Sequence, residues 1–148
     1  MPTKPCVIDI SHHNTVVSWD AIKAAGIQGV VHKASQGTRY GDDNHDKHRP
    51  NALKAGLLFG SYHFATNADP AAQVEWFLKH AKPDHTSLLA LDWEDNPDGP
   101  NMSVAQAREF LTRLMAKTNR APKDIWIYGG NVIKEMIRSP EDCAWFGQ

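Results

Sequence analysis

The sequence predicts an α/β fold in which parallel strands alternate with helices through right-handed crossovers. Short apolar runs alternate along the whole chain with segments of helical periodicity. In addition, the run 88–91 is continuously apolar, which is typical of a parallel strand buried on both faces. No linker, low-complexity tract or internal repeat is visible, so the 148 residues are expected to form a single domain, 1–148.

Six segments are predicted to be strands because they are apolar or β-branched runs bounded by turn residues. The first run is interrupted by Asp9, and the fifth is followed by Gly129 and Gly130, which predict a strand-to-helix turn. A long polar loop, 35–46, is expected after the second strand. The last segment is interpreted as the start of a sixth strand. In chain order the predicted strands are 6–10, 29–34, 57–64, 88–94, 125–128 and 143–146.

Helices are predicted from their start and stop signals. Ser18 and Asp69 are suitable N-caps, and Asp69 is followed by Pro in the first turn. Ser103 and Gln106 form a capping-box pattern. Gly26 ends the helix before it. The predicted helices are 19–25, 48–55, 70–80, a long one from 104 through at least 115, and 131–137.

The composition is ordinary for a globular protein, with 41% hydrophobic and 22% charged residues. A net charge of -1 gives no basic surface for nucleic acid. The eight His residues would make the chain cationic near pH 6, which suits an anionic polymer as substrate. No apolar run reaches the length of a membrane-spanning helix, so no membrane span is expected.

The two cysteines, Cys6 and Cys143, are expected to be buried thiols rather than a disulfide framework. Residues 1–5 lack the apolar region of a secretory signal peptide. We therefore expect either export by another route or a signal removed before this sequence begins.

Two acidic residues end the central apolar run. Asp92 and Glu94 are two positions apart, so on an extended strand their side chains point to the same side, and Trp93 points the other way. Carboxylates at the carboxyl end of a buried parallel strand are costly to desolvate, and in a closed barrel that end carries the chemistry. The alternative is a strand that runs into a solvated acidic turn, 95–100, and the D-x-E spacing alone does not decide between them.

Six segments along the chain carry a specific pattern. They are V-I-D-I-S-H-H-N (7–14), W-D-A-I-K-A-A-G-I (19–27), H-K-A-S-Q-G-T-R-Y (32–40), A-G-L-L-F-G-S-Y-H-F (55–64), L-A-L-D-W-E-D (89–95) and I-W-I-Y-G-G (125–130). In this order they resemble the glycoside hydrolase family 25 muramidases, which are lysozymes with an irregular parallel β/α barrel. The resemblance implies hydrolysis of the β-1,4 bond between N-acetylmuramic acid and N-acetylglucosamine in peptidoglycan.

The resemblance also implies roles for individual residues. Glu94 matches the general acid, Asp92 and Asp9 match the acidic residues beside it, and Tyr62 matches a sugar-site residue. Three clustered carboxyls raise one another's proton affinity, so one can stay protonated to donate to the leaving oxygen. Because the substrate is an N-acetyl sugar, we expect its acetamido oxygen to act as nucleophile, oriented by Asp92, rather than a covalent enzyme intermediate.

Further side chains are candidates for substrate binding or for other roles. His12 and Trp126 are candidate substrate contacts, and core packing is the alternative for Trp126. The adjacent pair His12 and His13 invites a metal site with Asp9 and His63. Adjacent histidines rarely share one ion, and no H-x-H or H-E-x-x-H spacing exists, so no metal or cofactor is expected.

The sequence also departs from the family. Members of the family continue beyond the segment matching 143–146 with two more strands and a late Asp, so the barrel is expected to be incomplete at its C-terminus. Open sheet edges predict self-association of two chains. A truncated barrel that binds cell-wall glycan without cutting it is the alternative function, and a metal-dependent deacetylase or amidohydrolase is a third class.

Overall fold

A six-stranded sheet organises the chain, and the computed structural model describes residues 6–147. Residues 1–5, on which the expectation about a signal peptide rests, lie outside the described residues. Five strands run parallel in the order β1-β2-β4-β5-β6, and β3 pairs antiparallel with β2. The strands are β1 (Val7–Ile10), β2 (Gly29–Gln36), β3 (Tyr40–Gly41), β4 (Leu58–Phe64), β5 (Leu88–Asp92) and β6 (Ile125–Tyr128).

The predicted helix starts are confirmed by hydrogen bonds from the caps. Ser18, Asp69 and Ser103 each accept a backbone N–H with their side chains, and Gln106 completes the capping box. Within residues 6–147 no helix is both long and apolar enough to cross a membrane. The helices are α1 (Trp19–Ala24), α2 (His45–Lys54), α3 (Pro70–Ala81), α4 (Val104–Thr118), α5 (Gly130–Met136) and α6 (Pro140–Phe146), with a 3-10 turn at Pro122–Asp124.

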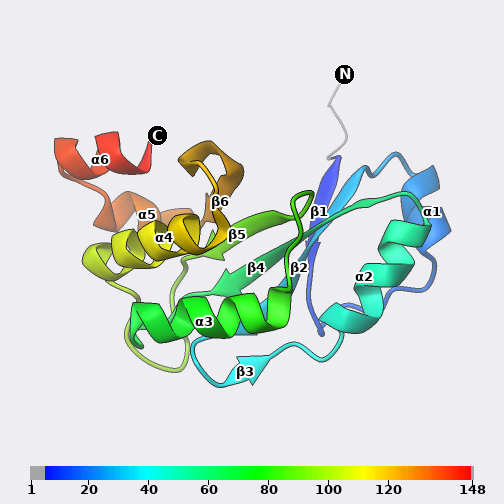
Figure 1. Cartoon of the computed structure of the whole chain (residues 1–148), viewed down its shortest axis with the longest axis horizontal. Helices are drawn as coiled ribbons and strands as arrows, with labels where there is room; N and C mark the ends of the chain where they lie inside the picture. Colours follow the sequence, from blue (N-terminus) through cyan, green and yellow to red (C-terminus); the bar gives the residue numbers. More distant parts are fainter. Residues whose placement is uncertain (1–5, 148) are drawn as a thin grey trace.

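The helices cover one face of the curled sheet and leave the other face open. Helices α3 and α4 run side by side, and α3 packs on β2 and β4 (Figure 1). The larger core lies under α3 and α4, with Phe77, Phe110 and Trp93 fully buried. A smaller core beside α2 contains Val30 and Phe59. The parallel sheet therefore forms part of a barrel, as the sequence predicts, with its concave face toward solvent.

The segment 143–146 is not a sixth strand, because it belongs to helix α6. Ser139 accepts a hydrogen bond from the amide of Asp142 at 3.0 Å, and Pro140 occupies the first helical position. Both are helix-start signals, and they lie before the apolar run 143–146 that suggested a strand. The aromatic end of α6 packs against the larger core.

Two further predictions about the chain are wrong. Cys6 and Cys143 are exposed free thiols, because one precedes the edge strand β1 and the other lies on the solvent side of α6. The expected loop 35–46 is shorter than predicted, because β2 continues to Gln36, β3 forms a short hairpin with it, and α2 begins at His45. Strand β1 is itself only partly buried, with Val7 and Asp9 exposed, because it is the edge of the sheet.

A layer of histidines lies between the sheet and the helices. His32 Nε2 lies 2.9 Å from Nδ1 of His48, and His45 Nε2 lies 2.8 Å from Oγ of Ser61. His63 is fully buried, and its ring stacks on Phe110. Burial lowers the pKa of both His32 and His63 to about 4, so these two rings are neutral in the folded protein at neutral pH.

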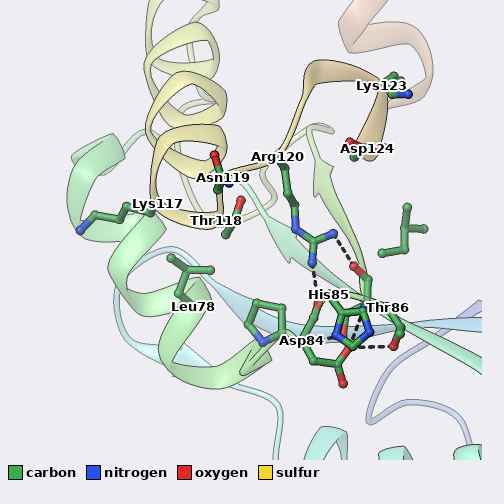
Figure 2. Close-up of a pocket in the computed structure, with 13 residues that line it drawn as sticks. Leu78, Asp84, His85, Thr86, Lys117, Thr118, Asn119, Arg120, Lys123 and Asp124 are labelled. Carbon is green, nitrogen blue, oxygen red and sulfur yellow. Dashed lines mark hydrogen bonds between the residues drawn. The ribbon is translucent and has the colours of Figure 1, made fainter.

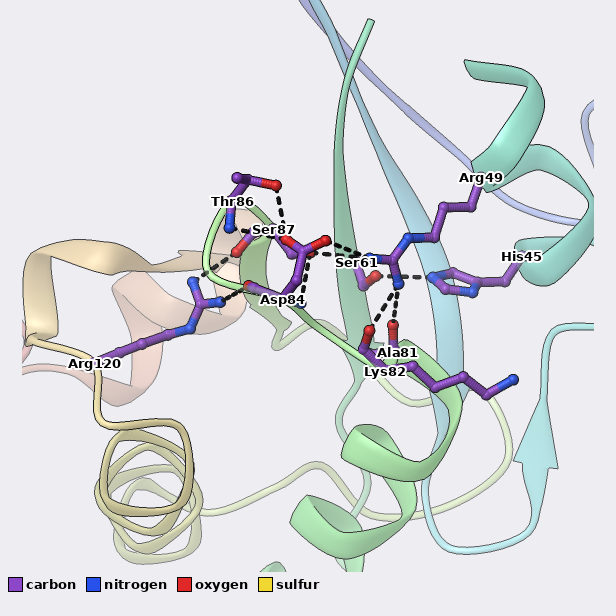
Figure 3. A network of polar contacts seen from close by, with 9 residues as sticks. All are labelled: His45, Arg49, Ser61, Ala81, Lys82, Asp84, Thr86, Ser87 and Arg120. Carbon is purple, nitrogen blue, oxygen red and sulfur yellow. Dashed lines mark hydrogen bonds and ion pairs between the residues drawn. The ribbon is translucent and has the colours of Figure 1, made fainter. Parts of the chain in front are cut away.

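Two arginines hold the connection between α3 and β5 (Figure 3). Arg120 donates hydrogen bonds to the carbonyl oxygens of Ser87 at 2.6 Å and Asp84 at 2.7 Å. Arg49 donates to the carbonyl oxygen of Ala81 and pairs with the Asp84 carboxylate at 3.2 Å. The start of β5, whose far end carries the acidic residues, is therefore fixed from both sides.

Candidate active-site groove

The alternation of side chains along three strands builds the open face of the sheet. Tyr62 on β4 is opposite Ala90 on β5, Ala90 is opposite Trp126 on β6, and Asp92 is opposite Tyr128. These residues point to the same side because positions two apart share a face. They line a groove with a volume of about 640 Å³.

All three predicted carboxyl residues line this groove. Asp9 comes from β1, Asp92 ends β5, and Glu94 follows Asp92 by two positions. Trp93 points away, is fully buried and donates its indole N–H to the carbonyl oxygen of Met102 at 2.8 Å. The sequence prediction that Asp92 and Glu94 share one side is therefore confirmed, and both belong to the groove rather than to a solvated turn.

The environment of Asp92 favours a bound proton. Burial, followed by the hydrogen bond and charge of the adjacent Glu94, raises its pKa to about 8, while Lys33 opposes the shift. The Oδ1 atom of Asp92 is buried and accepts no hydrogen bond from the described residues. Two carboxyls in contact avoid repulsion by sharing one proton, so the pair Asp92–Glu94 carries an acid at neutral pH.

Aromatic side chains line the same groove. Tyr62 is half-buried, and burial together with the charges of Asp92 and Asp9 raises the pKa of its hydroxyl. Trp126 is 50% exposed, so core packing is excluded for it. Tyr128 is 62% exposed and was not predicted as a site residue, although its position two residues after Trp126 on the same strand indicates it.

A second cavity adjoins the first. It has a volume of about 610 Å³ and contains His12, which the sequence predicted as a substrate contact. Glu94 lines both cavities. Lys33 and Tyr40, which were not predicted, also line the second cavity.

The four side chains considered as a metal site from the sequence do not come together in the structure. His63 faces the helices, hydrogen-bonded to Ser35 and Gln73, and does not reach Asp9 on the open face. Residues 6–147 contain no group of three or more His, Cys, Asp or Glu side chains placed to hold a metal ion.

A third cavity lies at the other end of the strands (Figure 2). Its volume is about 820 Å³, and Arg120, Lys117 and Lys123 line it beside the starts of β5 and β6. Arg120 is occupied by backbone carbonyls, and Lys117 pairs with Glu75. This cavity has no buried carboxyl pair, so the open groove is the better candidate for catalysis.

The groove combines three carboxyls with several aromatic rings on a curled parallel sheet. This combination is typical of a barrel-type glycoside hydrolase. Residues 8–135 match Glycosyl hydrolases family 25, and the chain belongs to this family.

Individual relatives agree with this membership. Lysozyme M1 of Streptomyces globisporus is 34% identical over an alignment of 131 residues, and the match covers 82% of this chain and 45% of that protein. The bacterial lysozyme from Streptomyces coelicolor aligns with a TM-score of 0.72 and 35% identity, covering 82% of this chain and 61% of its own. A family GH25 lysozyme from Aspergillus fumigatus aligns with a TM-score of 0.76 and 33% identity, covering 86% and 66%. The chain therefore spans about half the length of the curated lysozyme and about two thirds of the solved ones.

Proposed function

We propose that this chain is a peptidoglycan muramidase, a lysozyme that hydrolyses the β-1,4 bond between N-acetylmuramic acid and N-acetylglucosamine in bacterial cell walls. The observation that supports it most directly is the convergence of Asp9, Asp92 and Glu94 in one open groove of a family 25 fold. The similarity of the chain to proteins named as lysozymes supports the same activity. Residues 1–148 act as one catalytic domain, with no metal or cofactor in the reaction.

In this proposal Glu94 is the general acid. It lines both cavities, so a glycosidic oxygen between them lies within its reach, whereas Asp92 is only 7% exposed. When the glycan binds, the proton shared by the pair moves to Glu94 and leaves Asp92 charged. Glu94 then gives that proton to the leaving oxygen as the bond from that oxygen to the anomeric carbon breaks.

The acetamido oxygen of the substrate forms the new bond to the anomeric carbon, and Asp92 orients the acetamido group and balances its positive charge. Asp9 adds negative charge across the groove. Water then attacks the anomeric carbon and returns its proton to the Glu94 carboxylate. The acetamido group is released, so atoms and charge balance over the two steps.

Three side chains position the glycan in this proposal. Tyr62 presents a protonated hydroxyl beside the carboxyls, and Trp126 offers a half-exposed ring at the edge of the groove. Aromatic rings with one polar end suit the mixed surface of a sugar. His12 contacts the glycan from the second cavity.

The test is release of reducing ends from purified peptidoglycan by the parent and by Glu94→Gln. The variant keeps the shape of the side chain and loses the acidic proton, so the rate should fall by about a hundred- to ten-thousand-fold. Glu109→Gln, on the exposed side of α4, is the matched control and should cut as the parent does. Circular dichroism checks the fold of both variants. A folded Glu94→Gln variant that releases reducing ends at the parent rate contradicts the proposal.

A glycan-binding module without catalysis is the second candidate, because no described strand pairs with the far side of β6, and only Phe146 and Gly147 line the groove from the chain after β6. Sedimentation with insoluble peptidoglycan separates the two functions. Binding by the parent with no reducing ends above the blank supports the module. Release of reducing ends by the parent supports the muramidase.

We also propose that two chains associate through the open edges β1 and β6, which have no further strand partner among the described residues. Val7 on β1 and Trp126 and Tyr128 on β6 are exposed apolar or aromatic side chains at these edges. Light scattering should give a mass above that of one chain at high protein concentration. A constant monomer mass at all concentrations contradicts this association.

A further inference from the structure

The second cavity meets the catalytic groove at one residue. Glu94 is the only described residue that lines both cavities, and Asp9, Tyr62 and Trp126 line the first alone. If the sugar that reacts lies beside Asp9 and Asp92, a chain continuing past Glu94 enters the second cavity. The sugar on the leaving-group side is therefore the part of the substrate nearest to His12.

His12 is held in place by a buried carboxylate thirty residues away in the sequence. The Oδ2 atom of Asp42 accepts the backbone N–H of His12 at 2.9 Å and lies 3.0 Å from Nδ1 of the His12 ring. The Asp42 side chain has no exposed surface, while that of His12 is 35% exposed. Burial alone raises the pKa of Asp42, but hydrogen bonds from the amides of His12 and Asn44 lower it overall, so Asp42 is ionised.

This arrangement fixes which ring nitrogen of His12 carries the proton. An ionised carboxylate only accepts hydrogen bonds, so Nδ1 of His12 must carry the hydrogen that it donates to Asp42. The hydroxyl of Tyr40 lies 2.7 Å from the same Nδ1 atom and limits rotation of the ring. No described residue hydrogen-bonds to Nε2, which remains available to the cavity.

The rest of the cavity favours polar recognition. The Lys33 ammonium lies 5.2 Å from the ring centre of Tyr40 and 5.1 Å from that of Phe64, so it covers aromatic surface on which a sugar would otherwise stack. Lys33 itself donates to Oε1 of Gln36 at 2.7 Å. A sugar in this cavity therefore depends on hydrogen bonds, and the free Nε2 of His12 is a suitable partner for a hydroxyl, as acceptor when neutral or as donor when protonated.

We propose that Asp42 is a positioning residue that fixes the His12 ring, and that Nε2 of His12 hydrogen-bonds a hydroxyl of the sugar on the leaving-group side of the cut bond. This inference rests on the proposed muramidase function. It assigns Asp42 a role in substrate binding that acts entirely through His12.

The kinetic test compares His12→Ala, Asp42→Asn and the double variant on soluble peptidoglycan strands. Loss of one such hydrogen bond should raise KM by about tenfold and leave kcat within about twofold. If Asp42 acts through His12, the double variant should have the KM of His12→Ala alone. His85→Ala, exposed at the opposite cavity, is the control. A parent-like KM for folded His12→Ala overturns the inference and leaves the muramidase proposal standing.

Because Asp42 is buried, its variant could unfold, so a second measurement uses the unaltered site. Nitrogen NMR of the parent should show His12 with hydrogen on Nδ1. Addition of a tetramer of N-acetylglucosamine should shift the Nε2 signal of His12 as well as the indole signal of Trp126. A shift at Trp126 without one at His12 overturns the inference. If the parent releases no reducing ends while the His12 signal still shifts, the muramidase proposal fails and the His12 contact stands as a glycan-binding contact.

Discussion

The main chain of Gly129 lies directly against the carbonyl group of Trp93. A Cβ at position 129 would be 2.8 Å from the Trp93 carbonyl carbon and closer still to its oxygen. The same segment is tied on the other side, because the amide of Trp93 donates to the Tyr128 carbonyl oxygen at 2.7 Å. Gly129 therefore permits the close approach of two backbone segments, and Glu94 follows directly after one of them.

Gly129→Ala should destabilise the fold and impair catalysis together. The added methyl group forces backbone rather than a flexible side chain to move, which costs about 1–3 kcal/mol in packed sites. Urea unfolding measures the loss of stability, and reducing-end release measures activity. Gly99→Ala is the matched control, because its nearest neighbour would be Nδ2 of Asn96 at 3.6 Å, an ordinary contact. Equal unfolding midpoints for the two variants would show that position 129 tolerates the methyl group.

Asp92→Asn should change how stability depends on pH. The folded-state pKa of Asp92 is raised to about 8 from 3.8, so the folded protein keeps a proton that the unfolded chain loses between these values. The contribution of Asp92 to the stability of the parent should therefore decrease as pH rises from 4 to 8. The variant lacks this group and should be more stable than the parent at pH 8, on the order of 1–3 kcal/mol. Thermal unfolding across this range checks it, with the exposed Asp20→Asn as control.

The buried histidines predict the opposite dependence at lower pH. Burial lowers the pKa of His32 and His63 from 6.5 to about 4. Between these two pH values the unfolded chain binds protons that the folded protein does not bind. The contribution of these two histidines to stability should decrease as pH falls from 6.5 to 4, by on the order of 2–3 kcal/mol per histidine at most. His63→Gln should be less stable than the parent at pH 7 but lose less on acidification. The exposed His85→Gln should follow the parent, and a parent-like slope for His63→Gln would contradict the assignment.

Arg120→Ala should destabilise the protein because it leaves the carbonyl oxygens of Ser87 and Asp84 without their charged donor. Hydrogen bonds to charged groups contribute about 1.5–3 kcal/mol each. Arg113→Ala removes an exposed pair with Glu109 and should cost less than about 0.5 kcal/mol. Urea unfolding of the two variants gives the comparison. Equal losses would mean that Arg120 behaves as a surface residue.

Local signals in the sequence were sufficient for most elements of the fold. Ser18, Asp69 and Ser103 predicted helix starts, since capping depends on residues within one turn. The two-residue period predicted the shared side of Asp92 and Glu94. Helix α6 could not be predicted from its apolar end, which shows no periodicity over so short a length, because the helix is specified instead by the cap at Ser139.

Contacts between segments distant in the sequence could not be predicted from local sequence patterns. The pairing of His12 with Asp42 joins the end of β1 to the loop before α2, and no spacing in the sequence indicates it. The exposure of Cys6 depends on β1 being an edge strand, which follows from the order of strands in space. The close approach of Gly129 to Trp93 likewise arises only when β5 and β6 are paired.

Strand β4 contributes to the groove with one face and to the buried histidine layer with the other. Tyr62 points into the groove, and its neighbour His63 points into the packed layer behind it. If the chain is the muramidase proposed above, the pH range of its activity is consequently limited by a different group at each end. On the alkaline side, Asp92 loses its proton, so activity should fall as this carboxyl ionises. On the acidic side, the carboxyl pair keeps its proton, and protonation of His63 should instead weaken the packed layer behind the groove.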